Sequence, residues 1–318
     1  MPAKKKAQKQ TSAVDAASSG NPSWPSYKGT SQLVGTSPSG RVTVYVDPSL
    51  GQQALKNAQD LLHDSDRIVT ANDGFFGTTG GPVNAIVFAL GGATDGTGGA
   101  DHMACDYTGG NNIEVDASYG NSSRVSGLFE AELSECSMNG NLCGESTGEA
   151  LSRWCAAVVS NNALADFATA PQWAQDGEAD WVDKTENTDQ NADSTGCGMA
   201  FLSWLLSIGY ALDKIAPAMV SRGDAGTLAQ LYAKLTGDSG SNAWSKFKAA
   251  IKALPNGVTS DDPFHAFTAA AAMPAEIPAQ LAPDTSETQV RTKASAPAEA
   301  KGVCELKSHR LRLPKKSR

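Results

Sequence analysis

With 318 residues, 40% of them apolar, the chain is long enough to bury a substantial core in one large domain or two small ones. Its net charge of -8 is unevenly spread, because the first ten residues carry four lysines and residues 291–318 carry nine Lys or Arg against two Glu. Subtracting the +4 and +7 of these two ends leaves -19 on the remaining chain, and such an acidic body argues against nucleic acid as its ligand.

Both ends of the chain have compositions that do not favour a packed core. Residues 1–40 are rich in Ser, Gly, Pro and Lys, and residues 271–318 in Ala, Pro, Ser, Thr and charge, without apolar periodicity. We therefore expect one domain over residues 41–270 between two disordered basic tails. These tails are candidates for contact with an anionic surface, although short terminal charge runs are usually solvated.

No signal peptide is legible after the lysine run, and the longest apolar run, Met199 to Ile208, is too short to span a bilayer. We expect a soluble protein without a transmembrane segment and favour a cytoplasmic location. The six cysteines form no CxxC pair, so buried free thiols are the default interpretation. One or two disulfides are the alternative, and they would indicate an exported protein.

The first part of the expected domain reads as strands with one helix. Alternation predicts a strand over residues 41–46, Asp47-Pro48 opens a helix over residues 48–63, and an apolar run predicts a buried strand over residues 83–90. Shorter strands are expected over residues 102–107 and 112–115. The glycine-rich loop at residues 91–99 is a weak phosphate-binding candidate, because it lacks GK[ST] and a following helix.

From residue 122 onward the pattern is mostly helical. The expected helices cover residues 123–138, 146–160, 194–212, 213–220, 227–235 and 243–254. Strands early and helices late predict an α+β fold, in which a small mixed sheet is followed by a helical half.

The helix at residues 123–138 turns glutamates toward its apolar face. Val125, Leu128, Phe129 and Glu132 follow i, i+3, i+4 steps, and Glu135 lies beside the same stripe. A carboxylate on a buried face is costly unless it is paired, protonated or bound to a cation, so both glutamates are site candidates.

The next helix opens with Ser146-x-x-Glu149, which has the form of a capping box. Capping would fully account for Glu149. Glu149 is also a candidate site residue, so the sequence leaves both roles, helix capping and a functional site, open.

Ala131-Glu132-Leu133-Ser134-Glu135 resembles the HExxH helix of zinc peptidases of the zincin group, with both histidines replaced. The stretch from Gly144 to Ser152, GESTGEALS, resembles the segment of thermolysin-type peptidases that supplies the third zinc ligand. The similarity covers residues 41–160 and implies a zincin-like architecture. Segments around Asp180–Val182, Thr188–Asn191 and Ser194–Cys197 also resemble a group of uncharacterised proteins, which implies that the second half belongs to the same domain.

The resemblance places Glu132 on the general base, Glu135 on one metal ligand and Glu149 on another, with Glu145 in the same second stretch. Ala131 cannot ligate, so AELSE argues against zinc and against zinc peptidase activity. Oxygen ligands alone suit a hard divalent cation such as Ca²⁺, Mg²⁺ or Mn²⁺. Two inward glutamates are also the residues that a glycosidase uses as general acid and base.

Two further features carry weaker hypotheses. His102 ends the glycine-rich loop and is a candidate to face the first helix as a stray ligand or base, although a lone His near a strand is more often only hydrogen-bonded. The acidic stretch from Trp173 to Asp193 holds two tryptophans and is a candidate for sugar or calcium, but a solvated loop is the default.

These observations lead to the hypothesis of a catalytically degenerate, metallopeptidase-like protein with a binding or scaffold role toward an unknown protein or glycan. The alternative is a working hydrolase, peptidase or glycosidase, with a carboxylate site at Glu132, Glu135 and Glu149.

Overall fold

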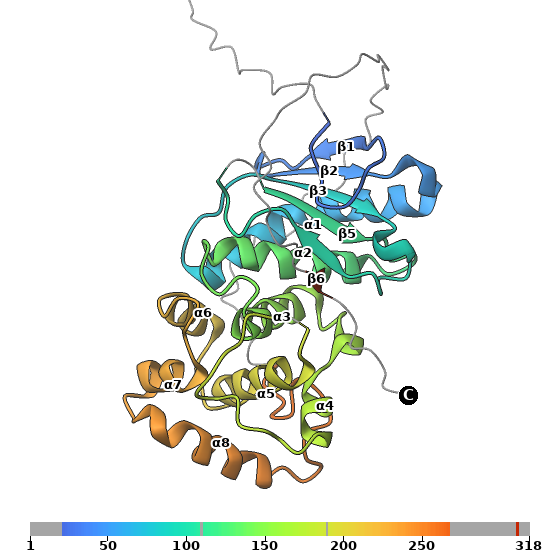
Figure 1. Ribbon diagram of the computed structural model, residues 1–318. Coiled ribbons are helices and arrows are strands. Elements are labelled where there is room, and N and C mark those ends of the chain that lie inside the picture. The colour runs from blue at the N-terminus through green and yellow to red at the C-terminus, as the bar shows by residue number, and fades with distance from the viewer. Residues whose placement is uncertain (1–20, 109–110, 189, 268–309, 312–318) are drawn as a thin grey trace, which may run out of the picture.

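The computed structural model describes residues 21–108, 111–188, 190–267 and 310–311. Figure 1 shows the sheet and the long helices that pack on it in the upper part of the molecule, with a helical part below them. This is the α+β arrangement that the order of strands and helices predicts, with a small mixed sheet preceding a helical half.

The sheet has the strand order β1-β2-β3-β5-β4-β6. Its centre is parallel and is formed by β2 (Val42–Val46), β3 (Val83–Phe88) and β5 (Asn111–Asp116). Its edges are antiparallel and are formed by β1 (Gln32–Thr36), β4 (Ala100–His102) and β6 (Arg310–Leu311). The predicted strand at residues 102–107 is wrong in position, because the sheet pairing ends at His102 and a loop follows.

Two helices, α1 (Gly51–Phe76) and α2 (Ser122–Ser137), cover one face of the sheet. A short 3-10 turn, η1 (Pro48–Leu50), leads into α1. This helix runs well beyond the predicted end at residue 63, because Ile68, Val69 and Phe75 continue its buried face past a polar stretch. It ends where Gly77 takes a left-handed conformation, with φ 67°.

The composition of residues 1–40 led us to expect a disordered tail, but residues 21–40 are ordered against the sheet. Trp24 is buried against Ile86 and Phe88 on the second face of the sheet, and Tyr27 packs on the same cluster. The buried Glu114 of β5 accepts hydrogen bonds from the backbone N–H groups of Ser26 and Tyr27 at 2.8 and 2.6 Å. Aromatic burial and a buried acceptor thus order this segment, and β1 follows it.

The expected C-terminal tail also needs correction at one place, because Arg310 and Leu311 form β6 beside β4. The pairing satisfies backbone groups of an edge strand, which composition does not report. The rest of the predicted tails, residues 1–20, 271–309 and 312–318, lies outside the described residues.

The helical half begins with α3 (Ser146–Ser160), which has the predicted bounds. The predicted helix at residues 194–212 is shorter, because Gly209, with φ 101°, separates α5 (Ala192–Ser207) from α6 (Leu212–Val220). The other helices are α4 (Ala170–Gln175), which was not predicted, α7 (Leu228–Thr236), α8 (Ala243–Lys252), and the 3-10 turns η2 (Leu90–Gly92), η3 (Ala165–Phe167) and η4 (Gly240–Asn242). No helix in the described ranges is both long and apolar enough to cross a bilayer.

Two weaker sequence candidates each lose one of their features in this fold. Trp173 is fully buried, stacks on Phe247 at 6.0 Å and donates its Nε1–H to the carbonyl of Ala179, so it is a core residue and not a platform for a sugar. In the glycine-rich loop, the N–H of Gly98 donates to Asp116 Oδ2 at 2.8 Å. A loop amide that already binds the chain's own carboxylate is a poor phosphate cradle.

Candidate functional site

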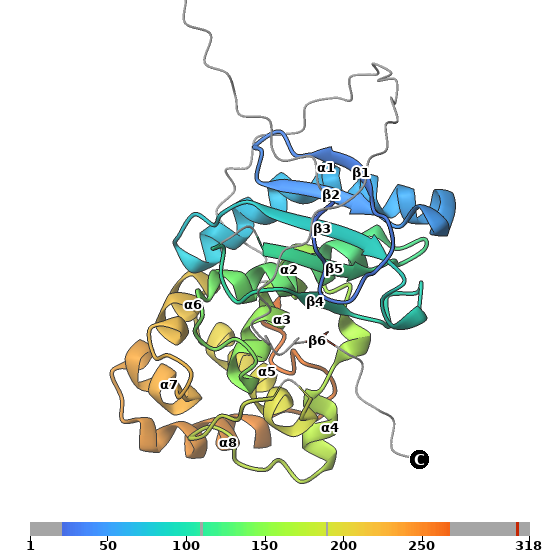
Figure 2. The ribbon, with the colours of Figure 1, turned by 45° about the horizontal axis from the view of Figure 1, so that its top comes forward.

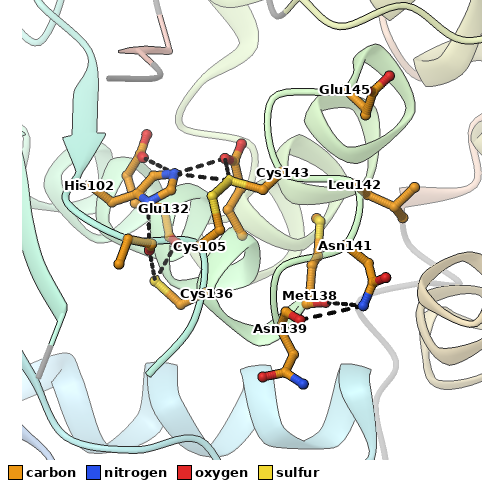
Figure 3. Close-up of a disulfide and its surroundings, with 12 residues drawn as sticks. His102, Cys105, Glu132, Cys136, Met138, Asn139, Asn141, Leu142, Cys143 and Glu145 are labelled. Atoms are coloured by element: carbon orange, nitrogen blue, oxygen red, sulfur yellow. Dashed lines mark hydrogen bonds and ion pairs between the residues drawn. A yellow bond between two sulfur atoms is a disulfide. The ribbon is translucent and has the colours of Figure 1, made fainter. Parts of the chain in front are cut away.

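The end of β4 meets the inward face of α2. His102, the last residue of β4, directs its ring at the two inward glutamates, with Nε2 at 3.0 Å from Glu135 Oε2 and 3.8 Å from Glu132 Oε2. Figure 3 shows the imidazole between the Glu132 carboxylate on one side and Cys143 on the other. The i, i+3 spacing on α2 therefore brings Glu132 and Glu135 to one place, and the strand beside it supplies His102.

The three side chains are withdrawn from solvent, with 1% of the His102, 4% of the Glu132 and 8% of the Glu135 side chain exposed. Burying a carboxylate is costly unless a cation or a hydrogen-bond donor lies against it, and here the His102 imidazole takes that position. At the level of the fold, α2 contacts both β4 and α3, which lie close to it in Figure 2.

Both nitrogens of the His102 ring face oxygen acceptors. Nδ1 lies 2.8 Å from the carbonyl oxygen of Ala104, and Nε2 lies 3.0 Å from Glu135 Oε2. Burial lowers the pKa of His102, but the hydrogen bond and negative charge of Glu135 outweigh it and raise the pKa above its ordinary value. When the ring is protonated, Nδ1 donates to the Ala104 carbonyl and Nε2 donates to Glu135 Oε2.

A disulfide between Cys105 and Cys143 lies against this cluster. The Sγ of Cys143 is 3.8 Å from His102 Nε2 (Figure 3). The same sulfur is 3.8 Å from Glu135 Oε2. The expectation of free buried thiols is thus wrong for this pair, while it is confirmed for Cys136, Cys155 and Cys197. The spacing His102-x-x-Cys105 is of a kind found among metal ligands. It is the sequence feature that could have indicated that Cys105 lies near His102.

A second layer of contacts fixes the loop that follows β4. Asn111 of β5 accepts from the N–H of Ala104 at 3.0 Å and donates to the Ala104 carbonyl and to Cys136 Sγ. Burial, followed by the charges of Glu132 and Glu135, raises the pKa of the Cys136 thiol well above its ordinary value. Asn111 thus holds the carbonyl that orients the His102 ring.

The remaining sequence candidates lie outside the cluster. Glu149 Oε1 is 4.0 Å from Nε of Arg153, one turn further along α3. Glu145 accepts from Asn187 Nδ2 at 2.9 Å and from Thr185 Oγ1 at 3.3 Å, which ties the start of α3 to the loop before α5. The predicted capping box at Ser146 is wrong, because Glu145 is the N-cap residue and α3 begins at Ser146 without a side-chain cap.

The described part of the chain contains two groups of residues that could hold a metal ion, and the ligand atoms within each group lie within 4.8 Å of one another. One group is His102, Glu132 and Glu135, and the other is His102, Cys105 and Cys143. The zinc site of a peptidase does not fit these residues at the places the sequence resemblance gives, because Ala131 has no ligand atom and Glu149 is in neither set. The structure offers one imidazole, two carboxylates and two sulfurs in its place.

No family model and no curated protein matches the sequence. Among solved structures, a mutant of an M1 zinc metallopeptidase from Deinococcus radiodurans aligns with a TM-score of 0.39 and 9% sequence identity. The alignment covers 65% of this chain and 48% of that one, so the match spans about half the length of the enzyme. A likeness this distant carries no argument about the site.

Proposed function

We propose that the protein is a catalytically degenerate, metallopeptidase-like protein, a pseudoenzyme, that acts by binding a partner or as a scaffold. The observation that carries the proposal is the ion pair between His102 Nε2 and Glu135 Oε2 at 3.0 Å, which closes the inward face of α2. The glutamate at the expected ligand position is thereby engaged by the chain itself.

Burial supports the same proposal. A hydrolytic metal centre keeps an open coordination position that water and substrate can reach. Here the three side chains are at most 8% exposed, and the Cys105–Cys143 disulfide covers them on one side. A cavity of about 460 Å³ is lined by Tyr107, Cys136 and Ser137 with residues of α6, and none of the three cluster residues lines it.

The second candidate function is a hydrolase, peptidase or glycosidase, with a divalent cation at the cluster and Glu132 as general base. The observation in its favour is that ligand atoms of His102, Glu132 and Glu135 lie within 4.8 Å of one another. Unlike an oxygen-only set, this group includes an imidazole, and it does not use Glu149.

Hydrolysis separates the two candidates. Wild-type protein and Glu132→Gln are incubated with a mixed peptide library and a glycan panel in the presence of Ca²⁺, Mn²⁺ or Zn²⁺. The control is Asp213→Asn, a half-exposed position on α6. We expect no turnover above background in any of the three proteins. Cation-dependent turnover that Asp213→Asn keeps and Glu132→Gln loses would refute the pseudoenzyme and establish the hydrolase.

A further inference from the structure

We propose that Cys105, Cys143, His102 and Glu135 form a zinc site that becomes available when the disulfide between the two cysteines is reduced. The disulfide and the His102–Glu135 pair are then the metal-free, oxidised form of one site.

The distances already approach those of a tetrahedral zinc centre. With Zn–S of about 2.3 Å and Zn–N or Zn–O of about 2.0–2.2 Å, tetrahedral ligand atoms lie about 3.3–3.8 Å from one another. Cys143 Sγ is 3.8 Å from His102 Nε2 and 3.8 Å from Glu135 Oε2, and the last two atoms are 3.0 Å apart. The ligand atoms of Cys105, Cys143 and His102 also lie within 4.8 Å of one another. The two sulfurs have to separate, and His102 Nε2 and Glu135 Oε2 have to move apart by a few tenths of an ångström.

The surroundings hold these atoms in a state suited to a metal. The His102 Nδ1–H donates to the Ala104 carbonyl at 2.8 Å, which leaves Nε2 to provide the lone pair. Asn111 fixes that carbonyl, so the ring orientation does not depend on Glu135. Two thiolates and an imidazole bind zinc in preference to hard cations such as Ca²⁺ and Mg²⁺.

A dithiol reductant can open the disulfide. The two thiols of the reductant deliver two electrons and two protons to the Cys105–Cys143 bond, which becomes two thiols, while the reductant closes into its own disulfide. Zinc binding then displaces the two thiol protons and the Nε2 proton into solution. In reverse, an oxidant such as a disulfide takes two electrons, the S–S bond forms again and zinc leaves.

A site with four protein ligands is closed, and closed zinc sites are structural. The inference agrees with a protein that lacks hydrolytic chemistry, but it does not rest on that role. The proposed function fails if turnover is found, whereas this site fails if reduction has no effect on thiophilic metal binding.

Cobalt titration of the full-length protein tests the site, because Co²⁺ replaces Zn²⁺ and absorbs by charge transfer when thiolates bind it. Protein with the disulfide intact, and protein reduced and freed of reductant under argon, are titrated with Co²⁺. Free thiols counted under denaturing conditions should differ by two between the samples. We expect one Co²⁺ per chain with thiolate charge-transfer absorption in the reduced protein, and no such band in the oxidised protein.

The variants Cys143→Ser and His102→Gln should each weaken Co²⁺ binding to the reduced protein by more than about 100-fold, which exceeds the usual effect of removing an outer-shell partner. The matched control is Cys197→Ala, which removes a buried thiol of α5 and should bind as wild type does. Folding of each variant is checked by its thermal transition, and one folded ligand variant suffices. The site is refuted if the reduced protein binds no Co²⁺, if both redox forms bind it equally, or if a folded ligand variant binds as tightly as Cys197→Ala.

Discussion

Among single residues, His102 has a large predicted effect on stability. Replacing it with Ala leaves Glu135 buried opposite an empty space, and breaking a buried ion pair from one side usually costs about 3–5 kcal/mol. We expect His102→Ala to lower the free energy of unfolding by that amount, measured by urea denaturation of the oxidised protein.

His63 provides the matched control, because it is exposed on α1. His63→Ala should change the free energy of unfolding by less than about 0.5 kcal/mol. A loss below about 1 kcal/mol in His102→Ala would contradict the picture of a buried pair.

Glu130 gives the fold a predictable dependence on pH. Burial raises its pKa to about 8, against hydrogen bonds from Asn72 and Ser134 and the charge of Arg67, which lower it, while Asp73 raises it further. A carboxyl with a raised folded-state pKa contributes stability that is fully present below pH 4.5 and is lost as the pH rises through 8.

Glu130→Gln removes this titration. Relative to wild type, the variant should become more stable between pH 5 and pH 9, by at most about 5 kcal/mol. Urea denaturation of both proteins at the two pH values measures the difference. Parallel pH profiles would show that the side chain stays ionised in the fold.

At this scale the sequence predicts what lies on one element and misses what different elements bring together. The inward direction of Glu132 and Glu135 follows from helical spacing alone. The contact of Cys143 with His102 joins residues 41 positions apart, which depends on how β4 crosses α2. Hence His102 was only one candidate among others, and Cys105 and Cys143 were not singled out as a pair.

At the scale of elements, β4 is short and carries His102, and its outer edge is paired with β6. The register joins Ala100 to Leu311 and Asp101 to Arg310. Removing residues 310–318 should expose that edge while leaving the interior of the sheet unchanged.

Amide hydrogen exchange measures this effect. Each lost backbone hydrogen bond is worth about 1 kcal/mol, so exchange within β4 should accelerate by about 5-fold for each bond lost, whereas β3 in the interior of the sheet should exchange as before. Unchanged exchange in β4 would show that β6 does not protect it in solution.

Element boundaries were predictable where local chemistry decides them. The strand at β2 and the helix α3 lie at or within one residue of their predicted limits, because alternation and helical periodicity there match burial. The prediction ended helix α1 too early because polar residues at positions 63–67 interrupt the apolar pattern, although the buried face continues through Ser65 to Phe76. β1 and β6 were missed because their partners, and not their own sequences, make them strands.

At the scale of the whole molecule, the Cys105–Cys143 disulfide joins the loop after β4 to the segment that leads into the helical half. It closes 38 residues of chain, and loop closure of this length is worth up to about 4 kcal/mol. Reduction without metal should therefore destabilise the protein by about 2–4 kcal/mol.

Thermal unfolding of oxidised, reduced, and reduced zinc-loaded protein checks this expectation. Zinc should return most of the lost stability to the reduced form, since a ligand that binds only the folded state stabilises it. A reduced protein as stable as the oxidised one would contradict the contribution of the cross-link.

The α+β class was predictable because strands precede helices along the chain. The covering of the second sheet face by residues 21–31 was not, because Trp24 and Tyr27 stand in a segment whose average composition indicates disorder. Two aromatic side chains and one buried acceptor, Glu114, outweigh that average.

The metal content of the oxidised protein tests the central claim, a buried cluster closed by its own ion pair, most directly. The protein is equilibrated with Ca²⁺, Mn²⁺ and Zn²⁺ in turn, passed through a desalting column and analysed for metal per chain. The closed His102–Glu135 pair predicts far less than one ion per chain in every case. One ion per chain in the oxidised protein, lost in Glu132→Gln, would contradict it and point to a metal-dependent hydrolase.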